Sequence, residues 1–272
     1  MITDMHSNEI LRKKAKEIRF SILTMVHEAG SGHIGGSMSA VEILLYLYLN
    51  HMRVRPGDPK WQDRDRFILS KGHATPVYYS VLAEAGFFPK KELKSFRKLG
   101  SRLQGHPDMK KTPGVDFSSG SLGQGLSVGG GMAWGLKRMG SSGRVFVLLG
   151  DGELNEGQVW EAAMSAVKFN LDNLIAIVDN NGVQLDGTTD EVMPLGSIGD
   201  KFKSFGWDVA QIDGHNIDEI GKALNLRHQR PLAIIAKTVK GKGVSFMENN
   251  HEWHGKPIDD VQYKSALKEI LK

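Results

Sequence analysis

Five short apolar runs of β-forming residues recur along this sequence, and segments with helical character separate them. The runs occupy residues 66–70, 145–150, 174–179, 207–213 and 231–239. Helical segments at 156–169 and 217–227 lie between them. Since each run is apolar on both faces, neither face of the strand is suited to water. The alternation of strand with helix therefore predicts an α/β fold, with a parallel sheet flanked by helices on both faces.

Two helices are predicted ahead of the first strand. Residues 8–29 carry apolar side chains at near-helical spacing, and Ser7 or Asn8 can cap their start. The run "SAVEILLYLYL", residues 39–49, predicts a second and more buried helix. No repeat, low-complexity stretch or linker divides the 272 residues. We therefore expect one domain over residues 1–272, with the helices of residues 8–50 packed on the α/β core.

Composition argues against several classes of protein. The absence of cysteine rules out a disulfide scaffold, a thiolate metal site and a cysteine nucleophile. No signal-type segment is present and no apolar run approaches the roughly 20 residues that cross a bilayer, so we expect a cytoplasmic protein without a membrane partner. The net charge is +4, with basic residues scattered through "KKELKSFRK", "DMKK" and "KTVKGKG". Without interleaved aromatic residues, these stretches indicate solvated surface and no nucleic-acid partner, although the charge suits phosphorylated substrates.

The run at 145–150 ends abruptly in Gly150-Asp151-Gly152. In open α/β sheets, ligands bind beyond the carboxyl ends of the strands, which is where Asp151 is expected. By itself the tripeptide also fits a tight turn. A calcium loop of the EF-hand type is excluded, because its sixth position must be glycine and here that position is Glu156.

A second polar pair, Asn180-Asn181, follows the next strand, and Asn181 lies 30 positions beyond Asp151. One βαβ crossover has about this length, so Asp151 and Asn181 should emerge at the same sheet edge from neighbouring strands. A carboxylate and an amide oxygen there form half of a site for Mg²⁺, which usually takes its other ligands from phosphates and water. Gly152 leaves room for a phosphate near the start of the following helix. The sequence therefore predicts a site for a metal diphosphate.

This pattern resembles the thiamine diphosphate motif, and "GDGELNEGQVWEA" with "NLIAIVDNNGVQLDG" resembles transketolase in particular. The resemblance covers roughly residues 8–260, which is only the first half of a usual transketolase. It implies the thiamine diphosphate-binding fold and transfer of a two-carbon ketol unit from a ketose to an aldose. It also implies that Asp151, Asn181 and the carbonyl of Val183 bind the cation that bridges the phosphates of the cofactor. That cation would be Mg²⁺ or another divalent ion such as Ca²⁺ or Mn²⁺.

Four histidines directly follow a glycine, and these are His33, His73, His106 and His215. A zinc site is not expected, because "HEWH" at 251–254 is one residue short of the HExxH motif. The segments "SGHIGGSMS", "LSKGHATPVYY", "QGHPD" and "HEWHGKPI" resemble histidine-bearing segments of transketolases, although Ile34 stands where many relatives have proline. By that resemblance His73 and His254 lie near the diphosphate and the reaction centre, and His33 and His106 bind the sugar hydroxyls. His215 has no such match and is interpreted as structural.

The glycine-rich stretch "SSGSLGQGLSVGGGMAWG", residues 118–135, is interpreted as a helix with small residues for close packing. A dinucleotide site is not expected, because Val128 replaces the third glycine of the fingerprint. In transketolases the matching stretch packs beside the aminopyrimidine of the cofactor. The resemblance therefore implies cofactor contacts for Gly120 and Leu122, although Ser121 replaces the commoner proline, and it places Leu185 among the cofactor-binding residues as well.

Glu156 and Glu161 fall on the helix that follows the Gly-Asp-Gly turn, where acidic residues near the positive helix end are ordinary. In transketolases the matched acids form a proton relay between two cofactors, which implies catalytic roles for both. The carboxylate that activates the aminopyrimidine comes from a second domain in that family. We therefore expect a C-terminal partner subunit that carries this carboxylate, a second copy of this chain in a two-fold heterotetramer, and sugar phosphates as substrates.

Two other functions stay open at this point. A 1-deoxyxylulose-5-phosphate synthase or the α subunit of a 2-oxo acid dehydrogenase shares the diphosphate motif, although "HEWHGKPI" and "QGHPD" favour transketolase. The other is a non-catalytic binding module that regulates a partner. The intact set of Asp151, Asn181, Glu156 and the histidines argues against it.

Overall fold

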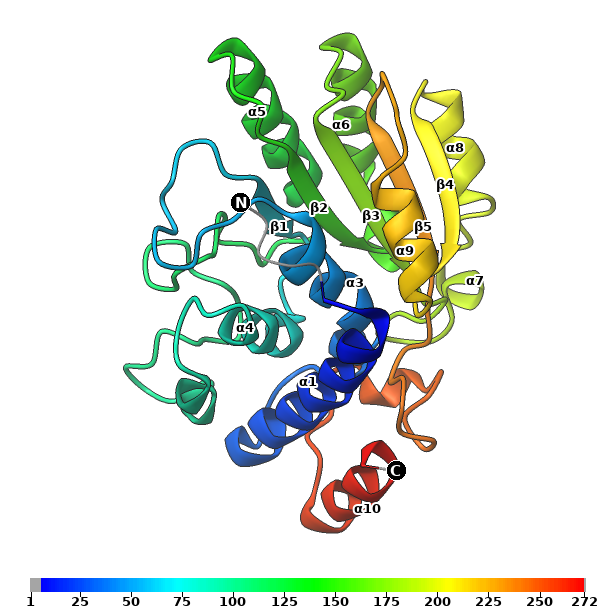
Figure 1. Cartoon of the computed structure of the whole chain (residues 1–272). Helices are drawn as coiled ribbons and strands as arrows, with labels where there is room; N and C mark the ends of the chain where they lie inside the picture. Colours follow the sequence, from blue (N-terminus) through cyan, green and yellow to red (C-terminus); the bar gives the residue numbers. More distant parts are fainter. Residues whose placement is uncertain (1–5, 272) are drawn as a thin grey trace.

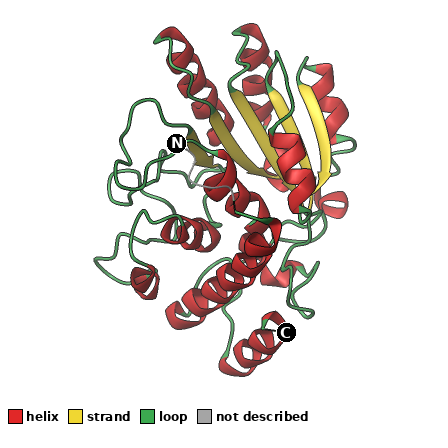
Figure 2. Ribbon diagram, viewed as in Figure 1, coloured by secondary structure: helices red, strands yellow, loops and turns green. Residues whose placement is uncertain are grey.

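The computed structural model describes residues 6–271, and its centre is a five-stranded parallel sheet of order β1-β2-β3-β5-β4 (Figure 1). The strands are β1 (Arg66–Leu69), β2 (Val145–Gly150), β3 (Leu174–Asn180), β4 (Asp208–Asp213) and β5 (Leu232–Lys237). Each neighbouring pair is parallel. Figure 2 shows helices on both sides of the sheet, so the predicted α/β architecture is confirmed.

Two separate hydrophobic cores lie on the two faces of the sheet. Phe146 and Leu148 of β2 face the core that includes α1 (Asn8–Ala29), α3 (Val41–Tyr46), α4 (Thr75–Glu84) and α9 (Ile217–Leu224). Val147 and Leu149 face the core formed with α5 (Gln124–Arg138), α6 (Gly157–Lys168) and α8 (Ile198–Ser204). Because successive strand residues point to opposite faces, a strand buried on both sides is expected to be apolar. The exception is β4, an edge strand whose residues are half-buried or exposed, so the expectation that every strand is buried on both faces is wrong there.

The N-terminal helices follow the sequence pattern only in part. Helix α1 has the predicted bounds, and the hydroxyl of Ser7 accepts a hydrogen bond from the N–H of Ile10 as its N-cap. The helix predicted at 39–49 begins two residues late, as α3, and continues directly into a π-helical turn at Leu47–His51. A short helix that the pattern did not predict, α2 (Gly35–Met38), precedes it. Ser39 lies in the turn between α2 and α3, and its hydroxyl donates to Asp179 of β3 at 2.5 Å.

The other elements are short or lie near the C-terminus. They are α7 (Thr189–Val192), α10 (Asp260–Ile270), and 3₁₀ turns at Lys90–Ser95, Gly152–Asn155 and His251–His254. Within residues 6–271, no helix combines the length and the apolar character that a membrane span requires. The single domain over residues 1–272 stays a prediction.

The register of the sheet determines which loops meet at its carboxyl edge. Gly150 of β2 pairs with Asp179 of β3, and Asn180 pairs with Lys237 of β5. The chain therefore leaves β2, β3 and β5 at nearly the same level. The loops that follow these three strands converge, which is the arrangement that builds binding sites in parallel sheets.

Candidate active site

A cavity of about 310 Å³ lies at the carboxyl ends of β2 and β3. Its wall includes Asp151, Asn181 and Val183, together with His73 and His254. The first three residues follow two strands that pair directly in the sheet. The structure therefore brings the Gly-Asp-Gly and Asn-Asn motifs to one edge, as their spacing predicts.

Asp151 is buried directly after β2, with 3% of its surface exposed. Its Oδ1 accepts a hydrogen bond from the N–H of Gly152 at 2.8 Å, and its Oδ2 accepts one from the N–H of Gly182. Burial, and then the nearby carboxylate of Asp179, raise the pKa of Asp151 to about 6. A cation beside Asp151 would offset the unfavourable burial of this charge, since an opposite charge favours the ionised form.

Asn181 and Val183 supply two neutral oxygens beside this carboxylate. Asn181 Oδ1 accepts a hydrogen bond from the N–H of Val183 at 3.0 Å, and its Nδ2 donates to Asp179 at 3.3 Å. The carbonyl of Val183 accepts from Nζ of Lys240 at 3.1 Å. Carboxylate, amide and backbone carbonyl oxygens are the ligands that Mg²⁺ and Ca²⁺ take in proteins. The donor set thus fits a hard divalent cation, and metal binding by these three residues stays a prediction.

Three of the histidines lie together at the cavity. The ring centroids of His33 and His73 are 5.0 Å apart, those of His73 and His254 are 4.9 Å apart, and those of His33 and His254 are 5.4 Å apart. Burial is the main cause that lowers all three pKa values: to about 4 for His33, to about 3 for His254, and well below the ordinary value for His73. The rings are therefore neutral near pH 7. Each neutral ring can both donate and accept one hydrogen bond, which suits recognition of hydroxyl groups.

The Nδ1 atom of His33 is buried and has no hydrogen-bond partner among the described residues. Buried polar atoms are nearly always satisfied in folded proteins, so an unsatisfied one requires an explanation. Arg97 lies close enough to lower the pKa of both His33 and His106, after the larger effect of burial. His106 itself is exposed and lies against Gly120. His106 also lies close enough to His33 to lower the pKa of that ring.

The residues expected to contact a cofactor have different positions. Leu122, Gly152 and Leu185 line the cavity, and the two leucine side chains are partly exposed on its wall. A Cβ atom on Gly152 would lie 2.4 Å from Oε1 of Gln184, so a side chain at this position would crowd the wall. Gly120 contacts His106 and is not part of the cavity lining. Cofactor contacts for these residues stay predictions.

The two glutamates with predicted catalytic roles do not reach the cavity within this chain. Glu156 precedes α6 as its N-cap residue, and Glu161 lies within α6. Both side chains are exposed. They lie on the surface of the helix that follows the Gly-Asp-Gly turn, and their catalytic roles remain predictions.

Several buried charged residues at the site were not predicted from the sequence. Asp179 is fully buried and accepts hydrogen bonds from Ser39, from Thr238 and from Lys71, with which it forms an ion pair. Despite burial, which raises the pKa of this carboxyl group, Lys71 lowers it overall. The sequence did contain a sign of this buried ion pair, because Asp179 lies inside an otherwise apolar strand. A charged group in that position must find a partner.

Glu153 is a second buried carboxylate, and it joins three segments of the site. Its carboxylate accepts hydrogen bonds from the N–H groups of Gly123 and Gly150, at 2.8 and 2.9 Å, and from the hydroxyl of Ser70. It therefore ties the glycine-rich segment to the ends of β1 and β2. In the sequence, only its position directly after Gly150-Asp151-Gly152 indicated that Glu153 belongs to the site.

The interpretation of "KTVKGKG" as solvated surface is wrong for Lys240, which is 2% exposed. Its Nζ donates to the carbonyls of Val183 and Gln184 at 3.1 Å and contacts Nδ1 of His254 at 2.8 Å. Burial lowers the pKa of Lys240 to about 8, and the charge of Lys71 contributes to the decrease. A glycine on its C-terminal side allows the loop to turn inward, because Gly241 has φ +77°.

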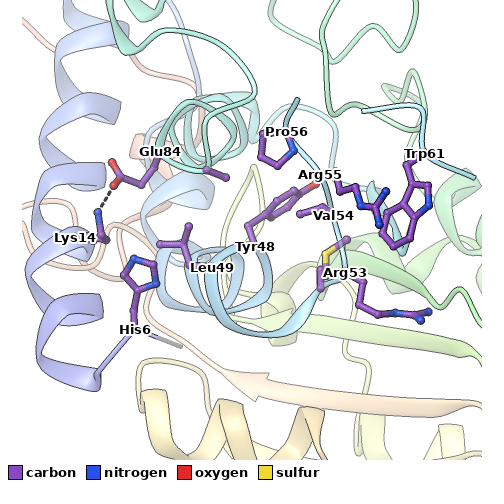
Figure 3. Close-up of a pocket in the computed structure, with 12 residues that line it drawn as sticks. His6, Lys14, Tyr48, Leu49, Arg53, Val54, Arg55, Pro56, Trp61 and Glu84 are labelled. Atoms are coloured by element: carbon purple, nitrogen blue, oxygen red, sulfur yellow. Dashed lines mark hydrogen bonds and ion pairs between the residues drawn. The ribbon is translucent and has the colours of Figure 1, made fainter. Parts of the chain in front are cut away.

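A second cavity, of about 340 Å³, lies among α1, the π-helical turn and α4 (Figure 3). Its charged residues are already paired: Lys14 with Glu84, and Arg53 with Asp65. The guanidinium of Arg55 lies 3.7 Å from the ring centroid of Trp61. Nδ1 of His6, on the same wall, is buried and has no hydrogen-bond partner among the described residues. The lining lacks the grouped carboxylate, amide and histidine side chains that mark the first cavity.

Comparison with known proteins agrees with this geometry. The family model described as "Transketolase, thiamine diphosphate binding domain" matches residues 10–271. The 6-deoxy-6-sulfo-D-fructose transketolase subunit of a Clostridium species is 42% identical over 96% of this chain and 96% of its own length. One of the subunits of the apulose-4-phosphate transketolase of Phocaeicola vulgatus is 41% identical over 96% of this chain and 94% of its own length.

Longer relatives match over part of their length. Human transketolase is 41% identical over 98% of this chain, which spans 43% of that protein. The crystal structure of transketolase from Campylobacter jejuni superimposes with a TM-score of 0.92 at 34% identity, over 97% of this chain and 43% of that one. The described fold therefore corresponds to less than half of these longer proteins.

Proposed function

This chain belongs to the transketolase family, in which it matches the thiamine diphosphate binding domain, and on that premise we propose that it is the cofactor-binding subunit of a two-chain transketolase. The enzyme transfers a two-carbon ketol unit from a ketose to an aldose. The observation that carries the proposal is the single cavity that joins Asp151, Asn181 and Val183 to the rings of His73 and His254. Neither a metal-ligand set nor a histidine cluster alone would specify this reaction.

The cofactor contributes an electron sink for breaking the carbon–carbon bond next to the ketose carbonyl. Asp151, Asn181 and the Val183 carbonyl would hold a divalent cation, with magnesium as the first choice. Gly152 keeps the wall open for the diphosphate, since a side chain there would meet Gln184. Leu122 and Leu185 offer apolar contact on the cavity wall. A cofactor contact of Gly120, which precedes Leu122 by two residues, is carried by the resemblance alone.

The neutral histidines act on the sugar. His33 has an unpaired buried nitrogen, which a substrate hydroxyl would satisfy. His106 is exposed and close to His33, and it binds a more distant hydroxyl. His73 and His254 line the cavity together with the predicted metal ligands and lie beside His33, so they orient the reacting end of the ketose and exchange protons with it.

A C-terminal partner chain completes the site. Full-length relatives have more than half of their length beyond the region that matches this chain, whereas relatives named as subunits match over nearly their whole length. The partner supplies the carboxylate that activates the aminopyrimidine, and two copies of each chain form a heterotetramer. Glu156 and Glu161 are exposed in the isolated chain, as a relay across such an assembly requires.

The substrate class is an anionic ketose. Two relatives carry names that specify a sulfonated ketose and a sugar phosphate. Sugar phosphates, including those of the pentose phosphate pathway, are therefore the first substrates to test, followed by sulfosugars. A cytoplasmic location stays a prediction.

The test is purification of the tagged chain from its source, followed by an assay for ketol transfer with thiamine diphosphate and magnesium. The proposal expects that a second chain co-purifies and that activity depends on it. Full activity of the chain alone would contradict the proposed partner. Decarboxylation of pyruvate without ketol transfer would contradict the proposed reaction.

A further inference from the structure

A buried cluster of three charged or titratable residues lies behind the cavity wall, and none of the roles above uses it. The cluster consists of Arg19 on α1, Glu42 on α3 and His215 in the loop after β4. Arg19 donates to the two carboxylate oxygens of Glu42 at 2.6 and 2.9 Å, and Nδ1 of His215 lies 2.9 Å from Oε2 of Glu42. Their side chains are 9%, 10% and 15% exposed, so the cluster is shielded from water.

The cluster forms hydrogen bonds near both ends of the loop at residues 238–242. The N–H of Val239 donates to Nε2 of His215 at 2.9 Å, and Nε of Arg19 donates to the carbonyl of Lys242 at 3.0 Å. Because an N–H can donate only to a ring nitrogen without a proton, Nδ1 of His215 carries the hydrogen and donates it to Glu42. Each member of the cluster is therefore fixed in orientation by its neighbour.

Lys240 lies between these two anchor points, and its ammonium group reaches the cavity. Nζ contacts the carbonyls of Val183 and Gln184 and the ring of His254, as described above. The next residue, Gly241, donates its N–H to the carbonyl of Gly35 at 3.1 Å, close to His33 in the chain. A shift of the loop would thus move Lys240 relative to one predicted metal ligand and one cavity histidine.

We propose that Arg19, Glu42 and His215 are positioning residues, which hold the 238–242 loop so that Lys240 points into the cavity. The ionised state of Glu42 supports this arrangement. Although burial raises the pKa of its carboxyl group, Arg19 and then His215 lower it to about 2. The consequence for cofactor binding rests on the proposed function, whereas the positioning of Lys240 does not.

The first experiment measures how accessible the Lys240 amine is. The full chain is labelled with a limiting amount of acetic anhydride, and mass spectrometry gives the acetylation rate of Lys240 relative to exposed Lys237 in the same protein. His215→Phe keeps a ring and removes the acceptor for Val239. This variant should increase the relative rate at Lys240 about tenfold, in keeping with loss of one buried hydrogen bond. His215→Gln can restore an acceptor near the Nε2 position and should stay within about threefold of the wild type.

A folded His215→Phe variant in which Lys240 keeps the wild-type labelling ratio would overturn the proposal. If that variant does not fold, His215→Asn is compared with His215→Gln, because the shorter asparagine cannot reach the N–H of Val239. Faster labelling of Lys240 in His215→Asn supports the proposal, and equal labelling in the two variants contradicts it.

A second readout separates this inference from the proposed function. In the assembled enzyme, calorimetry measures the affinity for thiamine diphosphate in the presence of magnesium for His215→Phe, Lys240→Met and the double variant. If His215 acts through Lys240, the double variant should bind as weakly as Lys240→Met, so that the two effects do not add. If the losses of affinity in the two single variants add in the double variant, His215 does not act through Lys240. Absence of binding by the wild type would count against the proposed function and would leave the labelling result to decide the positioning role.

Discussion

The carboxylate of Asp151 accepts a hydrogen bond from the backbone N–H of Gly182, although the two residues are 31 positions apart in the chain. This bond ties the loop after β2 to the loop after β3. It holds Asp151 beside Asn181 before any ligand arrives. The proposed cation site is therefore largely preorganised by the protein, which would reduce the ordering that ligand binding otherwise requires.

The first prediction concerns binding and stability at Asp151. Asp151→Asn should weaken magnesium-dependent binding of thiamine diphosphate by more than about 100-fold, since loss of even outer-shell metal partners typically weakens binding about 10- to 100-fold. The same change should alter the stability of the ligand-free chain by less than about 1 kcal/mol, because removal of a buried carboxylate whose pKa is raised to about 6 is offset by loss of the acceptor for one of the two backbone N–H groups.

Calorimetry and urea unfolding measure these two effects. Asp172→Asn, on the exposed surface, serves as the matched control. Unchanged cofactor affinity in Asp151→Asn would remove this residue from the metal site.

The second prediction concerns His33. His33→Ala should lower kcat/KM for the ketose by about 100-fold, in the range expected for groups that act on the reacting substrate. Thiamine diphosphate affinity should change less than about threefold, because His33 is not among the residues that line the cavity with the predicted metal ligands. Steady-state kinetics with the partner subunit provides the measurement, and His228→Ala, half-buried and outside the site, is the control. Equal activity of wild type and His33→Ala would exclude substrate contact.

The third prediction uses two glycines on one helix. A Cβ atom on Gly129 would lie 2.6 Å from Cγ2 of Val147, so Gly129→Ala should destabilise the chain by about 1–3 kcal/mol through overpacking between α5 and β2. A Cβ atom on Gly131 would meet nothing within 4 Å. Gly131→Ala should therefore stabilise the chain by about 0.5–1 kcal/mol, because alanine is the better helix former. Chemical denaturation of both variants tests the pair, and a common sign for the two changes would contradict the packing argument.

The fourth prediction concerns pH. Burial and then the charge of Arg144 lower the pKa of His51 to about 4, and Arg144 donates to its Nε2 at 2.9 Å. Since the folded-state pKa lies below the unfolded value of roughly 6.5, the unfolded chain binds more protons between these two values. The stability that His51 contributes is present above about pH 6.5 and is lost as the pH falls toward 4.

His51→Gln should therefore reduce the loss of stability between pH 7 and pH 5 by about 2 kcal/mol, from the size of the pKa shift. Urea unfolding at the two pH values measures the difference, and each protein serves as its own reference. An identical pH dependence in wild type and variant would mean that another group accounts for the acid sensitivity.

The sequence alone determined the sheet and the meeting of its two polar motifs. A strand buried on both faces is expected to be apolar, and this requirement is visible in the local sequence at residues 145–150 and 174–178, with Asp179 as the charged exception. The distance of 30 positions between Asp151 and Asn181 matches one crossover, so neighbouring strand ends could be expected. The resemblance of the histidine segments indicated His33, His73 and His254, which the structure brings together.

Only the tertiary structure decided how the buried charges are paired. Lys240 looked like a surface lysine among other lysines, and His215 had no match to any motif. The two become connected through Glu42 and Arg19, which come from helices about 200 positions earlier in the chain. The turn ahead of α3 likewise contains Ser39, which contacts Asp179 on β3. Local sequence reports propensity and the period of apolar residues, whereas the free energy of burying a charge depends on partners that only the folded chain brings into contact.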